Sequence, residues 1–222
     1  MPDTKVHAAD TKVSAIPERE WDLLQGEVVP LSQTAVLLRA PLFKDESSAG
    51  GKTFKILSVV DIKEYGHTAR PGKSIRINAF LQKAEKYRLK PFDVVISIVG
   101  TIGRICIVPE NAPDNWLPTS NMLIIRFKED RVDNALAFAM FMHSPHGERI
   151  LKSLTHGTKI AMISKKEFSK IGIPALTPEI RKQAQYLYMQ EEKLAHKIEE
   201  CLGTIRSLRG SYLQTHAGMV TV

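Results

Sequence analysis

The side chains best suited to chemistry in this sequence are cations and amides gathered between residues 63 and 90. Eight basic side chains occur there against two acidic ones, Glu64 and Glu85. Arginine forks and amides can read the edges of bases in a groove, and cations bind the phosphates. The segment therefore predicts a surface for a polyanion. Its candidate contact residues are Arg70, Lys73, Arg76, Asn78 and Gln82.

A glycine-bounded turn provides a second candidate. Gly100-Thr101-Ile102-Gly103 interrupts two apolar runs and matches a loop type that clamps a nucleic-acid backbone. A plain structural turn between two strands is the stronger interpretation, because glycines supply the backbone angles that such a turn needs. Even as a turn, it leaves Thr101 and Arg104 within reach of a phosphate.

A third set of candidates lies further along the chain. Thr158 and Lys159 follow a glycine in a loop, and Lys165 and Lys166 fall in the first turn of a predicted helix capped by Ser164. The N-terminus of a helix favours anions, so phosphate contact is one interpretation. Ordinary solvated lysines on a surface helix are the alternative.

Signals for catalysis, cofactors and metals are missing from the sequence. No carboxylate pair, activated nucleophile or N-P-P-F or D-P-P-Y methyltransferase tetrapeptide is evident, and Lys52-Thr53 lacks the context of a phosphate-binding loop. The histidines His143, His146 and His156 show no metal spacing and are expected in loops. Cys106 and Cys201 are far apart, which indicates structural roles in a reducing compartment. We expect a non-catalytic protein without cofactor or metal.

Composition supports a polyanion partner. The 222 residues carry a formal net charge of +7, and the long helix described next is nearly neutral, so the excess lies in the remainder. The sequence has no long apolar run and its N-terminus has no apolar signal core, which predicts a cytoplasmic protein.

The elements that must position these residues are predicted as strands at 34–43, 52–62, 92–110 and 121–130, and helices beginning near Asp133, Gly147 and Ser164. The pattern predicts an α+β fold, a mixed α/β domain followed by one long C-terminal coiled-coil helix. The expected division is a loose arm at 1–17, a domain at 18–175, a helix at 176–215 and a tail at 216–222.

The long helix should begin after the N-cap Thr177, with Pro178 in its first turn. A heptad seam that begins with Ile180, Ala184 and Leu187 runs along it and has no counterpart in the chain. This indicates a spacer or dimerisation element of about 54 Å. Glu191 interrupts the seam, either as a buried register-setting residue or at a local exposed turn. The seam residues proposed for dimerisation are Ile180, Leu187, Leu194, Ile198, Ile205, Leu208 and Tyr212.

Three stretches together resemble the specificity subunits of type I restriction-modification systems: residues 86–110, residues 156–185 and the heptad helix. The resemblance covers roughly residues 18–215 and rests on the GTIG-type apolar segment, the I-S-x-x-x-hydrophobic capping box and the I-P-hydrophobic-x-P segment. It implies a target recognition domain, double-stranded DNA and a DNA methyltransferase subunit as partners, and no catalysis.

This sequence departs from full-length members, which have two recognition domains and two long helices, because it has one of each. It resembles a half-length subunit, expected to form a homodimer through its helix and to read a bipartite site. A coiled-coil adaptor with a basic protein-binding domain is the alternative from another class, and a diverged nuclease or methyltransferase is a third.

Overall fold

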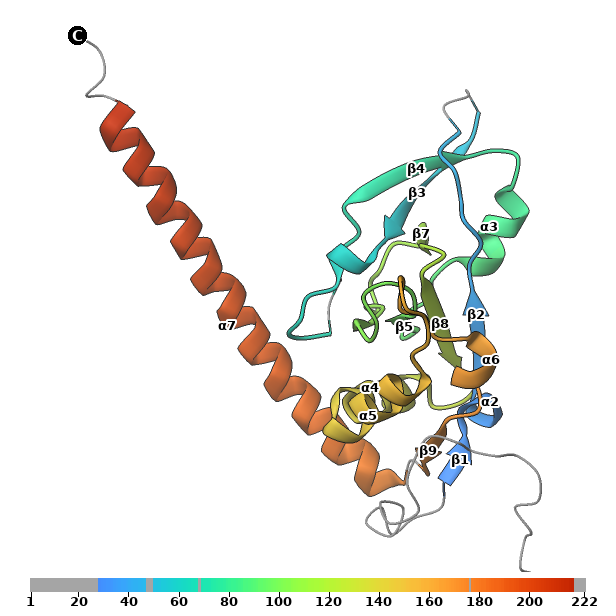
Figure 1. The fold of residues 1–222 in the computed structure, drawn as a ribbon. Helices are drawn as coiled ribbons and strands as arrows, with labels where there is room; N and C mark the ends of the chain where they lie inside the picture. The colour runs from blue at the N-terminus through green and yellow to red at the C-terminus, as the bar shows by residue number, and fades with distance from the viewer. Residues whose placement is uncertain (1–27, 47–49, 68, 176, 218–222) are drawn as a thin grey trace, which may run out of the picture.

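The computed structural model describes residues 28–46, 50–67, 69–175 and 177–217. The expected arm at 1–17, the first ten residues of the expected domain and most of the tail lie outside these ranges. Within them, helices and strands mix in one domain that is followed by one long helix, as the α+β prediction requires (Figure 1).

A four-stranded antiparallel sheet forms the centre of the domain. It has the order β2 (Ala35–Arg39), β8 (Met122–Phe127), β5 (Val94–Ser97), β6 (Ile105–Ile107). Successive side chains of a strand point to opposite faces, so Val94 and Ile96 enter one apolar cluster and Val95 enters another. Both faces of the sheet are therefore covered, which explains why β5 and β8 read as continuous apolar runs.

Three helices cover one face of this sheet: α4 (Arg131–His143), α5 (Pro145–Leu154) and the single turn α6 (Lys165–Phe168). Asp130, not Asp133, occupies the N-cap of α4, so the predicted start was three residues late. α4 and α5 pack closely, because a Cβ on Gly147 would lie 2.4 Å from the Cα of Met142. The predicted break at residues 143–145 is confirmed, since Ser144 ends α4 and caps α5.

A buried carboxylate ties the strands to α4. Asp93 is fully buried and accepts hydrogen bonds from Arg126 at 2.8 and 2.6 Å, from Arg131 at 3.3 Å and from the backbone of Lys90 at 2.8 Å. A buried charge is tolerated when it is paired and hydrogen-bonded in this way.

A smaller sheet lies beyond the other face of the central sheet (Figure 1). It has the order β4 (Lys73–Ile77), β3 (Lys52–Leu57), β7 (Trp116–Pro118), with β3 antiparallel to β4 and parallel to β7. The helix α3 (Leu81–Tyr87) covers it through the buried Ala84, and the 3₁₀ turn η2 (Val59–Asp61) follows β3. β4 carries Lys73 and Arg76 of the predicted basic surface, and α3 carries Gln82.

The ends of the described domain meet in a two-stranded ribbon. β1 (Val28–Pro30) pairs antiparallel with β9 (Gly172–Pro174), and the short helix α2 (Leu31–Thr34) connects β1 to β2. β9 ends four residues before α7 begins, so the long helix starts beside the ribbon.

The long helix α7 (Pro178–Ala217) has 40 residues, about 60 Å at about 1.5 Å per residue. Its predicted cap is confirmed, since the Oγ1 of Thr177 accepts from the backbone of Ile180 at 3.3 Å. The first part packs on α4, with Ala184 buried between them. From Gly203 to Tyr212 every residue is exposed, and this part projects away from the domain (Figure 1). Among the described residues, no helix has the length and apolar character needed to cross a bilayer.

Candidate nucleic-acid interface

The outer face of the β3–β4 pair presents polar and basic side chains. Thr53 lies opposite Arg76, and Lys55 lies opposite Ser74, and all four are exposed. Because side chains alternate along a strand, the intervening Phe54 and its neighbours face the core instead. Lys55 was not among the predicted contact residues, although its alternation with Phe54 and Ile56 was a signal that could have found it.

An acidic loop fixes β4 and the start of α3. Asp45 accepts a hydrogen bond from the backbone of Arg76 at 2.8 Å, and Glu46 accepts from the backbones of Asn78 and Ala79 at 2.9 and 2.8 Å. The backbone amides are thus satisfied locally, and the side chains of Arg76, Asn78 and Gln82 are exposed.

Arg70 and Arg76 differ from other arginines of the domain. Five of those donate hydrogen bonds to a carboxylate or a carbonyl oxygen: Arg39, Arg88, Arg104, Arg126 and Arg131. Arg70 and Arg76 are exposed and have no side-chain partner within the part of the chain that the structure describes. Their planar forks are therefore available for a phosphate or a base edge.

The two glycine loops lie side by side. The backbone N–H of Gly100 donates to the carbonyl of Ala161 at 2.8 Å, and that of Ile163 donates to Ile98 at 2.9 Å. The structure thereby brings exposed Thr101 near the loop that carries Thr158 and Lys159. Gly100 and Gly103 both have positive φ and connect antiparallel β5 and β6, which confirms the structural-turn interpretation. It does not exclude a phosphate contact.

Lys165 and Lys166 lie at the predicted helix start, but α6 is one turn long. The Oγ of Ser164 accepts from the backbone of Lys166 at 3.2 Å, while Glu167 contacts His156 instead of completing a capping box. So short a helix has little dipole, which weakens the argument for an anion site at its N-terminus. Both lysines remain exposed cations beside the glycine loops.

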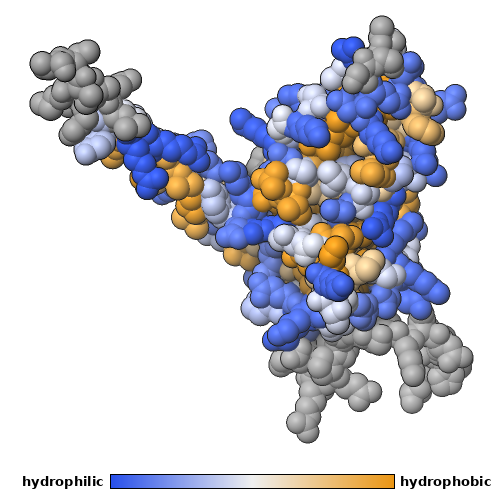
Figure 2. All heavy atoms as spheres, turned by 45° about the horizontal axis from the view of Figure 1, so that its top comes forward, coloured by the Kyte–Doolittle hydropathy of each residue, from blue (hydrophilic) through white to orange (hydrophobic). Residues whose placement is uncertain are grey.

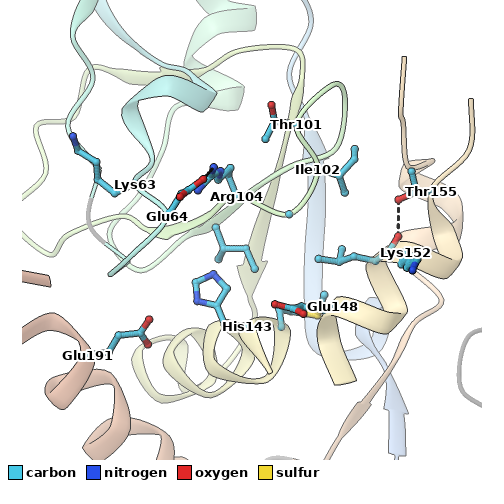
Figure 3. Close-up of a pocket in the computed structure, with 14 residues that line it drawn as sticks. Lys63, Glu64, Thr101, Ile102, Arg104, His143, Glu148, Lys152, Thr155 and Glu191 are labelled. Carbon is cyan, nitrogen blue, oxygen red and sulfur yellow. Dashed lines mark hydrogen bonds and ion pairs between the residues drawn. The ribbon is translucent and has the colours of Figure 1, made fainter. Parts of the chain in front are cut away.

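Arg104 is placed differently from the other candidates. It lines a cleft of about 590 Å³ between the glycine turn, α4, α5 and α7, and pairs with Glu64 (Figure 3). Figure 3 also shows His143 and Glu191 at this cleft, on α4 and α7 respectively. A phosphate contact by Arg104 would compete with its ion pair.

Segment 62–67 joins the domain to α7 at this cleft. The hydroxyl of Tyr65 donates to Glu199 at 2.7 Å, which raises the pKa of Tyr65 and lowers that of Glu199. The backbone of His67 donates to Glu192 at 2.6 Å. Gly66 has positive φ, and a Cβ there would lie 2.8 Å from the Cβ of Ala195. The helix is therefore held at a defined angle.

Glu191 corrects both sequence interpretations. It neither sets a register in the seam nor lies at an exposed turn, because its Oε2 contacts the buried ring of His67 at 3.0 Å. His146 is not a loop residue, because it lies in the first turn of α5, and neither is His143. His143 ends α4 and stacks on His67 at 4.7 Å between ring centroids. Burial, with the neighbouring His67, lowers the pKa of His143 to about 4, so its imidazole is neutral near pH 7.

The seam on α7 is exposed beside the face that packs on the domain. Ile198 is 40% exposed and Leu208 is 66% exposed, and apolar atoms follow the projecting helix (Figure 2). Ala184, a seam position in the sequence pattern, packs against α4. Every seam residue proposed for dimerisation is exposed: Ile180, Leu187, Leu194, Ile198, Ile205, Leu208 and Tyr212.

A family model described as "Type I restriction modification DNA specificity domain" matches residues 36–192. The chain belongs to this family. The match runs from β2 through the first turns of α7, so it includes both glycine loops, the β3–β4 surface and the cleft. A comparison with curated protein sequences finds no match.

Solved structures of such specificity subunits show the same fold. The S subunit of a type I system from M. genitalium is similar with a TM-score of 0.56 and 16% identity, over 87% of this chain and 46% of that one. The HsdS subunit from Thermoanaerobacter tengcongensis is similar with a TM-score of 0.53 and 13% identity, over 79% of this chain and 39% of that one.

A third structure comes from a study of complex assembly and conformational transition of the type I system. It gives a TM-score of 0.53 and 15% identity, over 94% of this chain and 47% of that one. The specificity-domain chain thus spans less than half the length of each of these three proteins.

Proposed function

We propose that this specificity-domain protein is the non-catalytic DNA-recognition component of a type I-like restriction-modification system in the cytoplasm. Residues 18–175 act as its target recognition domain and residues 176–215 as its spacer and dimerisation helix. It would direct a methyltransferase subunit, and a restriction subunit where one is present, to a bipartite site. The match to the DNA specificity family over residues 36–192 carries this proposal.

The two arginines that have no side-chain partner among the described residues support the proposal physically. The guanidinium groups of Arg70 and Arg76 are best able to read base edges. Asn78, which follows β4, and Gln82 in α3 would provide exposed amides for the same purpose. The remaining candidates would contact phosphates: Lys73, Thr101, Arg104, Thr158, Lys159, Lys165 and Lys166. In a plot of the logarithm of the binding constant against the logarithm of the salt concentration, each phosphate neutralised should make the negative slope steeper by about 0.9.

Selection from a random duplex library, followed by binding measurements at several salt concentrations, tests this function. Arg76→Ala should cost about 1–3 kcal/mol on the selected site if it reads a base. Arg76→Lys should keep salt-dependent binding but lose sequence preference, because lysine lacks the planar fork. Arg209→Ala, which removes one charge from the projecting part of α7, serves as the matched control.

The selected sequence also tests pairing. Two copies joined along their seams by a two-fold axis would present two recognition domains in opposite orientations, so the site should be a two-part palindrome. A chain that pairs with a different subunit would select only one half-site.

The adaptor hypothesis is favoured by one observation, the exposed seam, since an apolar stripe marks an interaction surface whatever the domain binds. It predicts self-association without binding to any duplex. That outcome would replace the DNA-recognition function proposed here.

A further inference from the structure

Three potential metal ligands from distant parts of the chain converge where α7 joins the domain. His67 comes from segment 62–67, His143 from the end of α4 and Glu191 from the middle of α7. One ligand atom of each lies within 4.8 Å of the other two. We propose that these residues bind a first-row divalent transition metal such as Zn²⁺ and thereby fasten the long helix to the domain.

The donor set has the right chemistry. Two imidazoles and one carboxylate are the three protein ligands of many zinc sites, in which the fourth position is open to water. A site of imidazole and carboxylate ligands should not select Cu⁺, because that soft ion prefers thiolate and thioether ligands. The buried thiol of Cys106 is not part of the group.

The three ligand atoms lie within 4.8 Å of one another, so side-chain rotations rather than backbone movements could bring them to the separations of a bound ion. Bonds of about 2.0–2.2 Å in a tetrahedron place ligand atoms about 3.3–3.6 Å apart. The Nε2 of His67 and the Oε2 of Glu191 are 3.0 Å apart, so this pair needs to separate by only a few tenths of an ångström. His143 and Glu191 both border the cleft, which gives their side chains room to turn and gives an ion a path of entry (Figure 3).

The surroundings of His67 point to a ligand. The ring is fully buried and stacks on the rings of His143 and Tyr188, at 4.7 and 5.1 Å between centroids. An imidazole binds a metal in its own plane, and the planes of His67 and His143 differ by only 19°, so His143 has to turn out of the stack to share an ion with His67. Its Nε2 contacts Glu191, whereas its Nδ1 is buried without a partner in the part of the chain that the structure describes. Buried polar atoms are rarely left unpaired. An ion bound to Nδ1 would satisfy this atom, whereas an ion bound to Nε2 would leave it without a partner. Whichever tautomer is present, a neutral imidazole has one nitrogen without a proton, and the lone pair of that nitrogen can bind a metal ion.

The binding site has a specific mechanical consequence. The three ligands belong to three different elements, so an ion would cross-link them and oppose any swing of α7 about the cleft. The site does not depend on the DNA-recognition function proposed above.

Metal binding to the full chain, prepared without a polyhistidine tag and stripped with a chelator, tests the proposal. We expect one Zn²⁺ per chain by equilibrium dialysis and an absorption spectrum of tetrahedral Co²⁺. His143→Gln and Glu191→Gln should each weaken binding at least about tenfold, since even residues outside the ligand shell commonly contribute that much. Zn²⁺ should raise the melting temperature of the unsubstituted chain more than that of either variant.

The surface pair His156 and Glu167, whose side chains approach to 3.3 Å, provides the control. His156→Gln removes an exposed histidine beside a carboxylate but should leave the binding of one ion intact. Circular dichroism of the stripped proteins establishes that each variant is folded. The proposal is overturned if the unsubstituted chain binds no Zn²⁺, or if folded His143→Gln and Glu191→Gln bind it as tightly as the unsubstituted chain.

Discussion

Replacing Gly147 by alanine should separate α4 from α5. A Cβ at this position would lie 2.4 Å from the Cα of Met142 and 2.5 Å from the carbonyl oxygens of Phe141 and Met142. These are backbone atoms, which cannot turn away as a side chain can. Because non-bonded carbons pack at about 3.5–4.0 Å, α5 would have to move by about 1 Å.

Overpacking of this kind costs about 1–3 kcal/mol. Alanine favours the helix over glycine by up to about 1 kcal/mol, which offsets part of the cost. We therefore expect Gly147→Ala to lower the free energy of unfolding by roughly 1–2 kcal/mol. The movement would also shift Glu148 and Lys152, which line the cleft.

Urea unfolding followed by circular dichroism measures this change as a lower midpoint at an unchanged slope. Gly203→Ala is the matched control, since its Cβ would meet nothing within 4 Å and Gly203 lies in the exposed part of α7. That variant should keep or slightly raise stability. An equal midpoint for Gly147→Ala and the unsubstituted protein would refute the close approach of the two helices.

Three further outcomes follow from the structure. Asp93→Asn should destabilise the domain by about 3 kcal/mol in urea unfolding, because two arginines lose the buried carboxylate between them. Burial raises the pKa of Cys106 to about 12, so a thiol reagent should modify only the exposed Cys201 in the native protein and both cysteines in denaturant. Leu194→Asp combined with Ile198→Asp should halve the mass measured by light scattering if copies pair along the seam, while circular dichroism stays unchanged; an unaltered mass would remove the seam from the interface.

The central strands and the start of α7 were predictable because their signals are local. Apolar runs flanked by glycine or acidic turns specify β5, β6 and β8, and a threonine cap followed by proline specifies the first turn of α7. A heptad count could not identify the face of α7 that packs on its own domain. For that reason Ala184 and Glu191 were assigned to the seam although they face α4 and His67.

The cluster at the helix joint was not predictable from spacing. His67, His143 and Glu191 are brought together by three elements that are distant in the chain, and no short motif records their proximity. Similarly, the sequence marks Arg70 and Arg104 as equivalent cations. Only the structure shows that Arg104 pairs with Glu64, whereas the side chain of Arg70 has no partner among the described residues.

The pairing of β1 with β9 brings the two ends of the described domain together, which would allow the domain to be exchanged as a unit. The described part of the domain begins with β1 and its last strand is β9, and Val28 of β1 pairs with Pro174 of β9. A domain whose ends lie side by side can be replaced by a related domain while its junction with α7 is preserved. The new domain would keep the direction of α7 only if it also supplied the contacts that His67 and α4 make with α7.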